Sequence, residues 1–560
     1  MTTDSFREPT AVDLVAERWV DTLVELEPTL GTSIGRSESD GRFGDLSPEG
    51  GERMRAAVAA ALTELEGAVP VDDIDRVTVA DLGSELRLSL EAHDAGLPLR
   101  DLNVIASPAQ ELRDVFDLMP TAEVVDWERV ADRLHAVPAA LAGYAATLRE
   151  GIRTGVTPAV RQVALVAEQA DAIAAPRGFF ASLAAEAAPA SGSLPASLAG
   201  RLEDGARRAA AAYGGLARFL RGELAPAARD EDAVGRELYA LQSRRFLGAV
   251  VDLDETYEWG VEELARMTQE QEAIAREILP GASVAEAVAH LDADPSRVLH
   301  GVDALQRWMQ ETSDRAVREL AGTAFDIPEE LRRLECRIAP THEGGIYYTG
   351  PSDDFSRPGR MWWSVPVGVT EFATWRELTT VYHEGIPGHH LQIGQAVHNR
   401  GRLNTWRRQL AGTSGHAEGW ALYAERLMEG FGYLDDPADR LGMLDGQRMR
   451  AARVVLDIGV HLGKRMPGSD EVWSAESALE FMRANVNMDD AFIRFEVNRY
   501  LGWPGQAPSY KIGQRIWEQL RDETAAREGA AFSLSAFHRR ALDLGGVGLD
   551  TLRGSLAAGA

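Results

Sequence analysis

A proline among closely spaced histidines is the feature that most constrains how this chain can fold. His383 is followed by His389 and His390, and Pro387 and Gly388 lie between them. On a straight helix the two later histidines would lie about 9 to 10.5 Å beyond His383 along the axis. The ring of Pro387 would clash with the carbonyl of His383, and Gly388 allows the backbone to turn. The sequence therefore predicts a helix that breaks after His383 and returns a later histidine towards it.

The same segment has the chemistry of an expanded zinc-binding motif. In the ordinary H-E-x-x-H arrangement, two histidines one helical turn apart bind zinc, and the glutamate polarises a water molecule. His383 and Glu384 supply the first ligand and the glutamate. Spacing alone leaves both later histidines open as the second ligand. The Gly-His pair at Gly388 matches the end of many zinc motifs, which favours His389 and leaves His390 for a role beside the metal or the substrate.

A third ligand is expected on the next helix. Glu418 opens a segment whose apolar residues predict a buried helix. Two-histidine, one-glutamate peptidases complete their zinc site in this way and leave the fourth position to water. Glu425, two turns further along, either supports a ligand or belongs to a solvated face. His416 belongs to the cap region of this helix or contacts the substrate.

The combination of these features, and no single one, points to a metal. His-Glu pairs are common on helix surfaces, and Pro-Gly pairs usually mark turns. Here three histidines and two glutamates gather within about 36 residues of a chain that has only 12 histidines. The sequence therefore predicts a site for zinc or another divalent metal.

The predicted site indicates how a peptide bond would be hydrolysed. Glu384 would accept a proton from the metal-activated water and deliver it to the leaving amine. A hydrogen-bond donor beyond the metal would stabilise the oxyanion, and Tyr510, His390 and His416 are the candidates.

Two cations are candidates for binding the terminal carboxylate of a substrate. Arg499 or Lys511 would make the enzyme a carboxypeptidase or dipeptidase. Lys511 and Lys464 are the only lysines among 58 basic residues. Because Lys and Arg are not interchangeable at sites, Lys511 is a functional candidate, with a surface lysine retained by chance as the alternative.

Several sequence blocks resemble the signature segments of a large bacterial family catalogued as a domain of unknown function: HEGIPGHHLQ, EGWALYAE and RYLGWPGQAPSYKIG. The fold of that family is similar to that of the Taq-type zinc carboxypeptidases. The resemblance covers most of the chain and implies a mostly helical metallopeptidase fold with a long cleft. It implies no particular substrate, and the expanded histidine spacing departs from the carboxypeptidase pattern.

Helical periodicity dominates the chain and predicts a mainly α fold. The family resemblance implies that this is a large two-lobed metallopeptidase-like fold. Residues 1–250 are expected to form an N-terminal helical lobe and residues 251–560 the lobe with the metal site, together one structural unit. Between Glu335 and Val365, β-branched and aromatic runs are separated by Gly, Pro and Asp. These runs predict a small β-sheet beside the active-site helix.

Charge and cysteine content restrict the partners and the compartment. The formal net charge is −29, whereas nucleic acids and anionic membranes require a basic face, so neither is expected as a partner. Cys336 is the only cysteine, so no intrachain disulfide can form. The N-terminal residues lack the apolar run of a secretory signal, and no apolar stretch is long enough to span a membrane. These features predict a cytoplasmic protein and leave the oligomeric state open.

Two other functions remain open beside the favoured one. A metallohydrolase of a non-peptide amide or ester would use the same residues with a different pocket. A helical binding protein with a structural metal would close all four positions with protein ligands. The favoured prediction is a zinc-dependent peptidase, carboxypeptidase- or dipeptidase-like, that acts on a peptide or small amide substrate.

Overall fold

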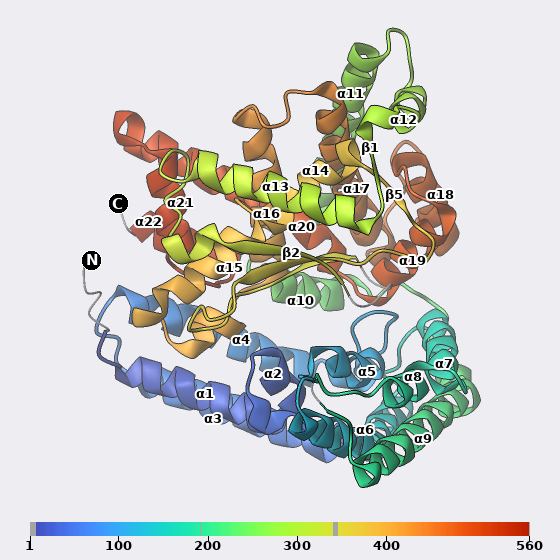
Figure 1. Ribbon diagram of the computed structural model, residues 1–560. Coiled ribbons are helices and arrows are strands. Elements are labelled where there is room, and N and C mark those ends of the chain that lie inside the picture. The colour runs from blue at the N-terminus through green and yellow to red at the C-terminus, as the bar shows by residue number, and fades with distance from the viewer. Residues whose placement is uncertain (1–6, 191, 340–344, 559–560) are drawn as a thin grey trace.

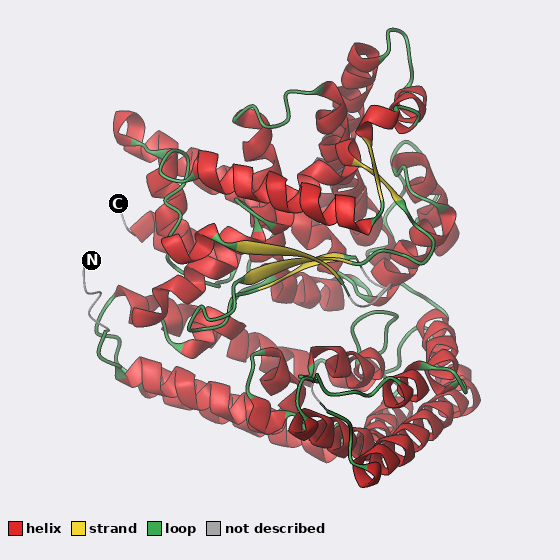
Figure 2. Ribbon diagram, viewed as in Figure 1, coloured by secondary structure: helices red, strands yellow, loops and turns green. Residues whose placement is uncertain are grey.

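The computed structural model describes residues 7–190, 192–339 and 345–558. Helices dominate these residues, and the strands are few and short, as Figure 2 shows. The prediction of a mainly α fold with a small sheet is confirmed. Residues 1–6 carry part of the prediction about a secretory signal and lie outside the described residues.

The N-terminal part of the chain is helical and runs from blue to green in Figure 1. Its helices are α1 (Ala11–Leu26), α2 (Pro28–Ser33), α3 (Pro48–Gly67), α4 (Asp73–Asp94), α5 (Pro108–Leu118), α6 (Val124–Thr154), α7 (Val160–Ala174), α8 (Phe179–Ala185) and α9 (Ala196–Phe219). Helices α5 to α9 bury one apolar cluster. Helices α1, α3 and α4 bury another, which includes Trp406 from much later in the chain.

The remaining helices surround the largest apolar cluster. They are α10 (Arg236–Leu247), α11 (Leu253–Ile278), α12 (Val284–Asp292), α13 (Val302–Leu320), α14 (Thr374–Glu384), α15 (His389–His398), α16 (Ser414–Gly430), α17 (Pro437–His461), α18 (Ala475–Asn485), α19 (Asp490–Gly502), α20 (Gln506–Glu528), α21 (Leu534–Leu542) and α22 (Leu549–Ala558). Helix α17 packs against α11, α14 and α20, so that it is buried along most of its length.

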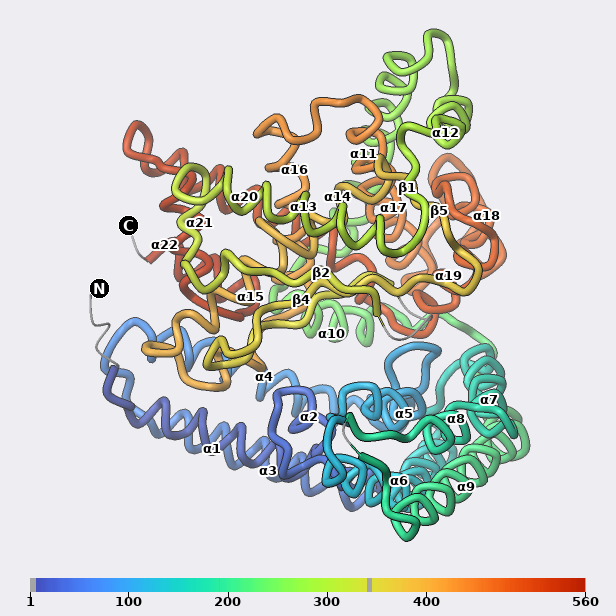
Figure 3. Tube along the Cα trace, viewed as in Figure 1, coloured from blue at the N-terminus to red at the C-terminus, as the bar shows by residue number. Residues whose placement is uncertain are grey.

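Helix α10 connects the two parts of the molecule. It contacts α4 on one side and α16 and α20 on the other, and Figure 3 shows it between the N-terminal helices and the rest of the chain. Its residues Tyr239 and Leu247 belong to the largest apolar cluster. The division into lobes at residue 250 stays a prediction.

The three-stranded sheet lies where the aromatic and β-branched runs predict it, whereas the sequence did not predict the two-stranded sheet. Strands β2 (Leu334–Ile338), β4 (Gly359–Trp363) and β3 (Ile346–Thr349) form one sheet in that order, with β2 parallel and β3 antiparallel to β4. Strands β1 (Val298–His300) and β5 (Glu371–Ala373) form an antiparallel pair. On β3, the hydroxyl of Tyr348 lies 2.8 Å from Nδ1 of His390 on α15, which places this sheet beside the helix break.

The helix is interrupted between α14 and α15, as Pro387 predicts. Helix α14 ends at Glu384 and α15 begins at His389. A Cβ atom at Gly388 would lie 1.8 Å from the carbonyl oxygen of His383, so only glycine can occupy this position without a shift of the backbone. This close approach folds the start of α15 back onto the end of α14.

Candidate metal centre

The helix break brings His389 next to His383. One potential ligand atom from each of His383, Glu384 and His389 lies within 4.8 Å of the others. Oε2 of Glu418 lies 3.3 Å from Nε2 of His383 and 3.6 Å from Nε2 of His389. Ligand atoms bound tetrahedrally to zinc lie about 3.3 Å apart, given bonds of about 2.0 to 2.1 Å. The three predicted ligands thus lie at separations that suit one zinc ion.

Glycine contacts between α16 and α20 place Glu418 at this group. A Cβ atom at Gly419 would lie 2.4 Å from the carbonyl carbon of Gly513, and one at Gly513 would lie 2.1 Å from the carbonyl oxygen of Gly415. The two helices can approach this closely only because they carry glycine at the contact. Glu418 on α16 and Tyr510 on α20 flank the contact, so both reach the same region.

Burial and unsatisfied oxygens indicate that the group suits a cation. His383, Glu384 and His389 are each less than 10% exposed, at 5%, 6% and 8%. Oε2 of Glu384 and Oε2 of Glu418 are buried and accept no hydrogen bond from the described residues. A buried carboxylate oxygen without a donor is costly, and a divalent cation would satisfy both oxygens. Two imidazoles and a carboxylate form a ligand set that fits zinc.

The electrostatics of the group are those of closely packed acids and imidazoles. Burial acts to lower the pKa of His383, but the carboxylates of Glu418 and Glu425 outweigh it and raise that pKa to about 10. Burial opposes ionisation of Glu418, yet His383 and His389 hold the pKa of this carboxyl well below its usual value. Glu418 is therefore ready to act as a charged ligand.

Glu425 supports the first ligand. Nδ1 of His383 donates to Oε1 of Glu425 at 2.8 Å, and Nε2 of Gln447 donates to Oε2 of Glu425 at 3.0 Å. Glu425 is buried, so the alternative of a solvated face does not hold. A carboxylate that receives Nδ1–H leaves Nε2 of the histidine free to bind a metal.

His390 points away from the metal group. Tyr348 donates to its Nδ1, and its Nε2 donates to the carbonyl of Leu331, both at 2.8 Å. Burial lowers the pKa of His390 to about 4, so the ring is neutral. With both nitrogens engaged, His390 has no free atom for a metal or an oxyanion. The structure corrects the prediction of a catalytic His390 and separates it from His389.

His416 is a core residue. It lies in the first turn of α16. The centroid of its ring lies 5.5 Å from the centroid of the Trp517 ring. Burial lowers the pKa of His416 to about 3. Its Nδ1 lies 3.4 Å from the amide nitrogen of Gln392. This enclosure corrects the prediction that His416 contacts the substrate.

Arg499 and Lys511 are both engaged inside the protein. Arg499 binds Glu496 through Nε and Nη2, at 3.0 and 2.9 Å, and Gln506 through Nη1 at 2.6 Å. Nζ of Lys511 lies 2.8 to 3.0 Å from three acceptors, on Glu263, Gln447 and Gln514. A substrate carboxylate would have to displace these partners, so the structure corrects the substrate-binding roles predicted for Arg499 and Lys511.

Tyr510 remains at the site. Its half-buried ring lies 5.2 Å from the guanidinium carbon of Arg453. Burial and the neighbouring carboxylate of Glu418 raise the pKa of Tyr510 to about 12, so the hydroxyl keeps its proton at neutral pH. Tyr510 can therefore donate a hydrogen bond, and its role towards an oxyanion stays a prediction.

Arg450 is a site residue that the sequence did not reveal. It lies on α17, near enough to Glu384, Glu425 and Tyr510 to shift their proton equilibria. In the described part of the chain, no ion pair holds its guanidinium, and its buried Nε has no hydrogen-bond partner. Arginine is common in amphipathic helices, and Arg450 does not belong to a recognisable sequence motif.

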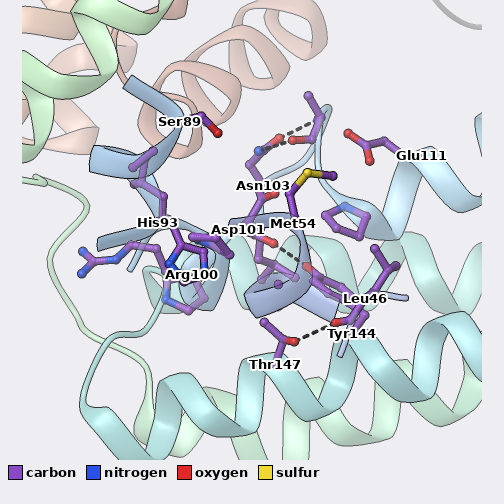
Figure 4. A pocket seen from close by; sticks show the side chains of 18 of the residues that line it. Leu46, Met54, Ser89, His93, Arg100, Asp101, Asn103, Glu111, Tyr144 and Thr147 are labelled. Carbon is purple, nitrogen blue, oxygen red and sulfur yellow. Dashed lines mark hydrogen bonds between the residues drawn. The ribbon is translucent and has the colours of Figure 1, made fainter. Parts of the chain in front are cut away.

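A separate cavity of about 630 Å³ lies among the N-terminal helices and residues 501–504 (Figure 4). Its lining includes Glu27, Asp101 and Glu111, and none of the metal-group residues. Burial, together with repulsion from Glu111, raises the pKa values of Glu27 and Asp101 to about 7. Acidic groups and His93 therefore line this cavity, apart from the residues of the metal group.

One protein family accounts for nearly the whole sequence. The sequence profile of DUF885, described as bacterial protein of unknown function, matches residues 28–556. The chain belongs to this family. The resemblance inferred from the sequence blocks is thus confirmed. No curated protein matches this DUF885 protein.

Two solved structures show the same fold, and a third is less similar. A protein from Colwellia psychrerythraea has 22% sequence identity and a TM-score of 0.85, with 98% of each chain covered. One from Shewanella oneidensis has 18% identity and a TM-score of 0.74, with 97% of this chain and 99% of the other covered. A carboxypeptidase from Pyrococcus furiosus has 11% identity and a TM-score of 0.45, with 99% of this chain and 96% of the other covered.

The first two neighbours correct the predicted location. Each is described as a putative lipoprotein. Lipoproteins are anchored to a membrane by lipid, so this finding overturns the prediction of a cytoplasmic protein. Among the described residues of this DUF885 protein, no helix combines the length and apolar character of a membrane span.

Proposed function

We propose that this DUF885 protein is a zinc-dependent peptidase that removes residues from the free carboxyl end of peptides. The observation that carries the proposal is the position of Oε2 of Glu418, 3.3 and 3.6 Å from Nε2 of His383 and His389. Glu384 lies beside them with a free buried oxygen. Three protein ligands leave one position of a tetrahedral zinc open, which favours catalysis over a structural metal.

The proposed reaction divides the work among four residues. His383, His389 and Glu418 would hold the zinc ion, which would polarise the scissile carbonyl and lower the pKa of water to about 7. Glu384 accepts the proton of that water at Oε2 and passes it to the leaving amine. Tyr510 donates its hydroxyl proton in a hydrogen bond to the developing oxyanion. Glu425 keeps His383 oriented throughout.

Arg450 supplies the specificity for a free carboxyl end. Its guanidinium has no ion-pair partner in the described part of the chain, and its charge acts on Glu384 and Tyr510. A guanidinium binds a carboxylate with two parallel hydrogen bonds. This residue replaces Arg499 and Lys511 in the predicted role.

A peptide series tests the proposal. Peptides with a free carboxyl end are expected to be cleaved by the zinc-loaded protein, and peptides with an amidated end far more slowly. Arg450→Met is expected to lower kcat/KM for the free peptides by at least about 30-fold, the equivalent of about 2 kcal/mol, because it removes a charged pair with the substrate. Steady-state kinetics on both series measure the effect.

Arg448→Met is the matched control. Arg448 lies on the same helix and bonds instead to Gln271 and Asn485, so its loss should not change kcat/KM. Equal cleavage of free and amidated peptides would contradict the role of Arg450. Cleavage of esters or non-peptide amides, with no cleavage of peptides, would favour the alternative function, a metallohydrolase of non-peptide substrates.

The same proposal extends to the location of the enzyme. The two neighbours with the same fold are described as lipoproteins. We therefore place the peptidase activity outside the cytoplasm. Fractionation of cells that produce the protein checks this location.

A further inference from the structure

Buried hydrogen bonds link His383 to Lys511 across four helices. Nδ1 of His383 on α14 donates to Glu425 on α16 at 2.8 Å. The other oxygen of Glu425 accepts from Nε2 of Gln447 on α17 at 3.0 Å. Oε1 of Gln447 accepts from Nζ of Lys511 on α20 at 2.8 Å. Each of these residues is at most 5% exposed, so water has little access to the bonds.

Lys511 decides which way the amide of Gln447 faces. The oxygen and nitrogen of an amide are nearly equal in size, so shape alone allows either orientation. An ammonium group only donates, and it therefore requires the amide oxygen. The amide nitrogen then faces two acceptors, Oε2 of Glu425 and the carbonyl of Leu422 at 3.3 Å. In the reverse orientation the amide oxygen of Gln447 would face Oε2 of Glu425 and the carbonyl oxygen of Leu422, and neither of these atoms can donate a hydrogen bond.

The orientation of Gln447 passes on to the metal ligand. With a donor on Oε2, Glu425 offers Oε1 as an acceptor, and His383 must place its proton on Nδ1. Once the ring is neutral, as metal binding requires, the lone pair lies on Nε2, which points at Glu418 and the candidate metal position. A neutral histidine binds metal only through the nitrogen that carries no proton.

The site of Lys511 is built for an ammonium. Its three N–H groups meet Gln447, Gln514 and Glu263 at 2.8, 2.9 and 3.0 Å. Burial acts to raise the pKa of Glu263, but Arg266 and Lys511 lower it to about 2, so this carboxylate is charged and balances the ammonium. A planar guanidinium cannot direct three bonds in this way. The site explains a lysine in a chain whose other basic residues, except Lys464, are arginines.

We propose that Lys511 is a positioning residue for the metal centre, which acts through Gln447 and Glu425 to hold His383 in the tautomer that presents Nε2 to zinc. This inference rests on the proposed zinc site. It assigns to Lys511 a role at a distance, with no contact to the substrate.

Zinc affinity of the whole chain tests the inference. Competition with a chromophoric chelator measures Kd for zinc, and loss of a supporting partner typically weakens metal binding by about 10- to 100-fold. Lys511→Met is expected to weaken zinc binding by that amount, since methionine keeps most of the volume and removes the donors. Lys464→Met is the matched control, because Lys464 pairs with Asp254 away from this chain of bonds and should bind zinc as the wild type does.

A double-mutant comparison separates positioning from general damage. Gln447→Met is expected to weaken zinc binding to the same degree as Lys511→Met, and the double variant no further than Gln447→Met alone. Additive losses, or unchanged zinc affinity in Lys511→Met, would overturn the inference. If Lys511→Met does not fold, the zinc affinity of Gln447→Met alone tests the inference. Unchanged zinc affinity in Gln447→Met would show that Lys511 does not act on His383 through Gln447. A wild-type protein that binds no zinc would overturn the proposed function together with the inference.

Discussion

Glu384→Gln is expected to lower kcat for peptide hydrolysis by about 10²- to 10⁴-fold and to leave zinc bound. The amide keeps the shape of the side chain but cannot accept the proton of the attacking water. Glu384 has a buried oxygen without a hydrogen-bond donor among the described residues, so no other partner holds the carboxylate away from this task. Steady-state kinetics and zinc analysis of the purified variant measure the two effects separately.

Zinc content decides between two roles for Glu384. Its carboxylate lies within 4.8 Å of both histidines and could itself bind the metal. Loss of zinc from Glu384→Gln would show that it is a ligand and that the assigned proton transfer is wrong. Glu377→Gln, two turns earlier on α14, is the control and should retain both zinc and activity.

His389→Ala is expected to lose zinc and nearly all peptidase activity, whereas His390→Ala keeps its zinc. The two residues are neighbours in sequence, and only His389 has Nε2 near Glu418. Loss of a residue that supports a ligand weakens metal binding by about 10- to 100-fold. Loss of a direct ligand should weaken zinc binding by more than this. Chelator competition on both variants gives the comparison.

His390→Ala should affect stability. It removes the bonds to Tyr348 and to the carbonyl of Leu331, and it leaves a cavity in a buried position. A lower melting temperature with wild-type zinc affinity is therefore expected. Zinc loss from His390→Ala, with retention by His389→Ala, would reverse the ligand assignment.

The amino-acid sequence was sufficient to predict the fold class and to select the groups that the structure brings together at the candidate metal site. Helical periodicity is a local property, and so are the aromatic runs that form β2, β3 and β4. The break at Pro387 also follows from local sterics, because the proline ring and the carbonyl of His383 belong to the same turn. Glu418 could be predicted because zinc requires a further ligand and few carboxylates follow the motif so closely.

Only the tertiary structure decided what the buried charged residues do. Lys511 and Arg499 are as prominent in the sequence as Glu418, yet one meets Glu263, about 250 residues earlier in the chain, and the other meets Glu496. Arg450 has no sequence signal, and within the described part of the chain packing leaves it without an ion-pair partner while its charge acts on Glu384. A charge in a low-dielectric interior acts according to the group that faces it. Packing selects that group, which lies on a remote helix for Lys511 and on the same helix for Arg499. Motif spacing therefore identifies ligands that are close in sequence, whereas packing selects among the remaining charged groups.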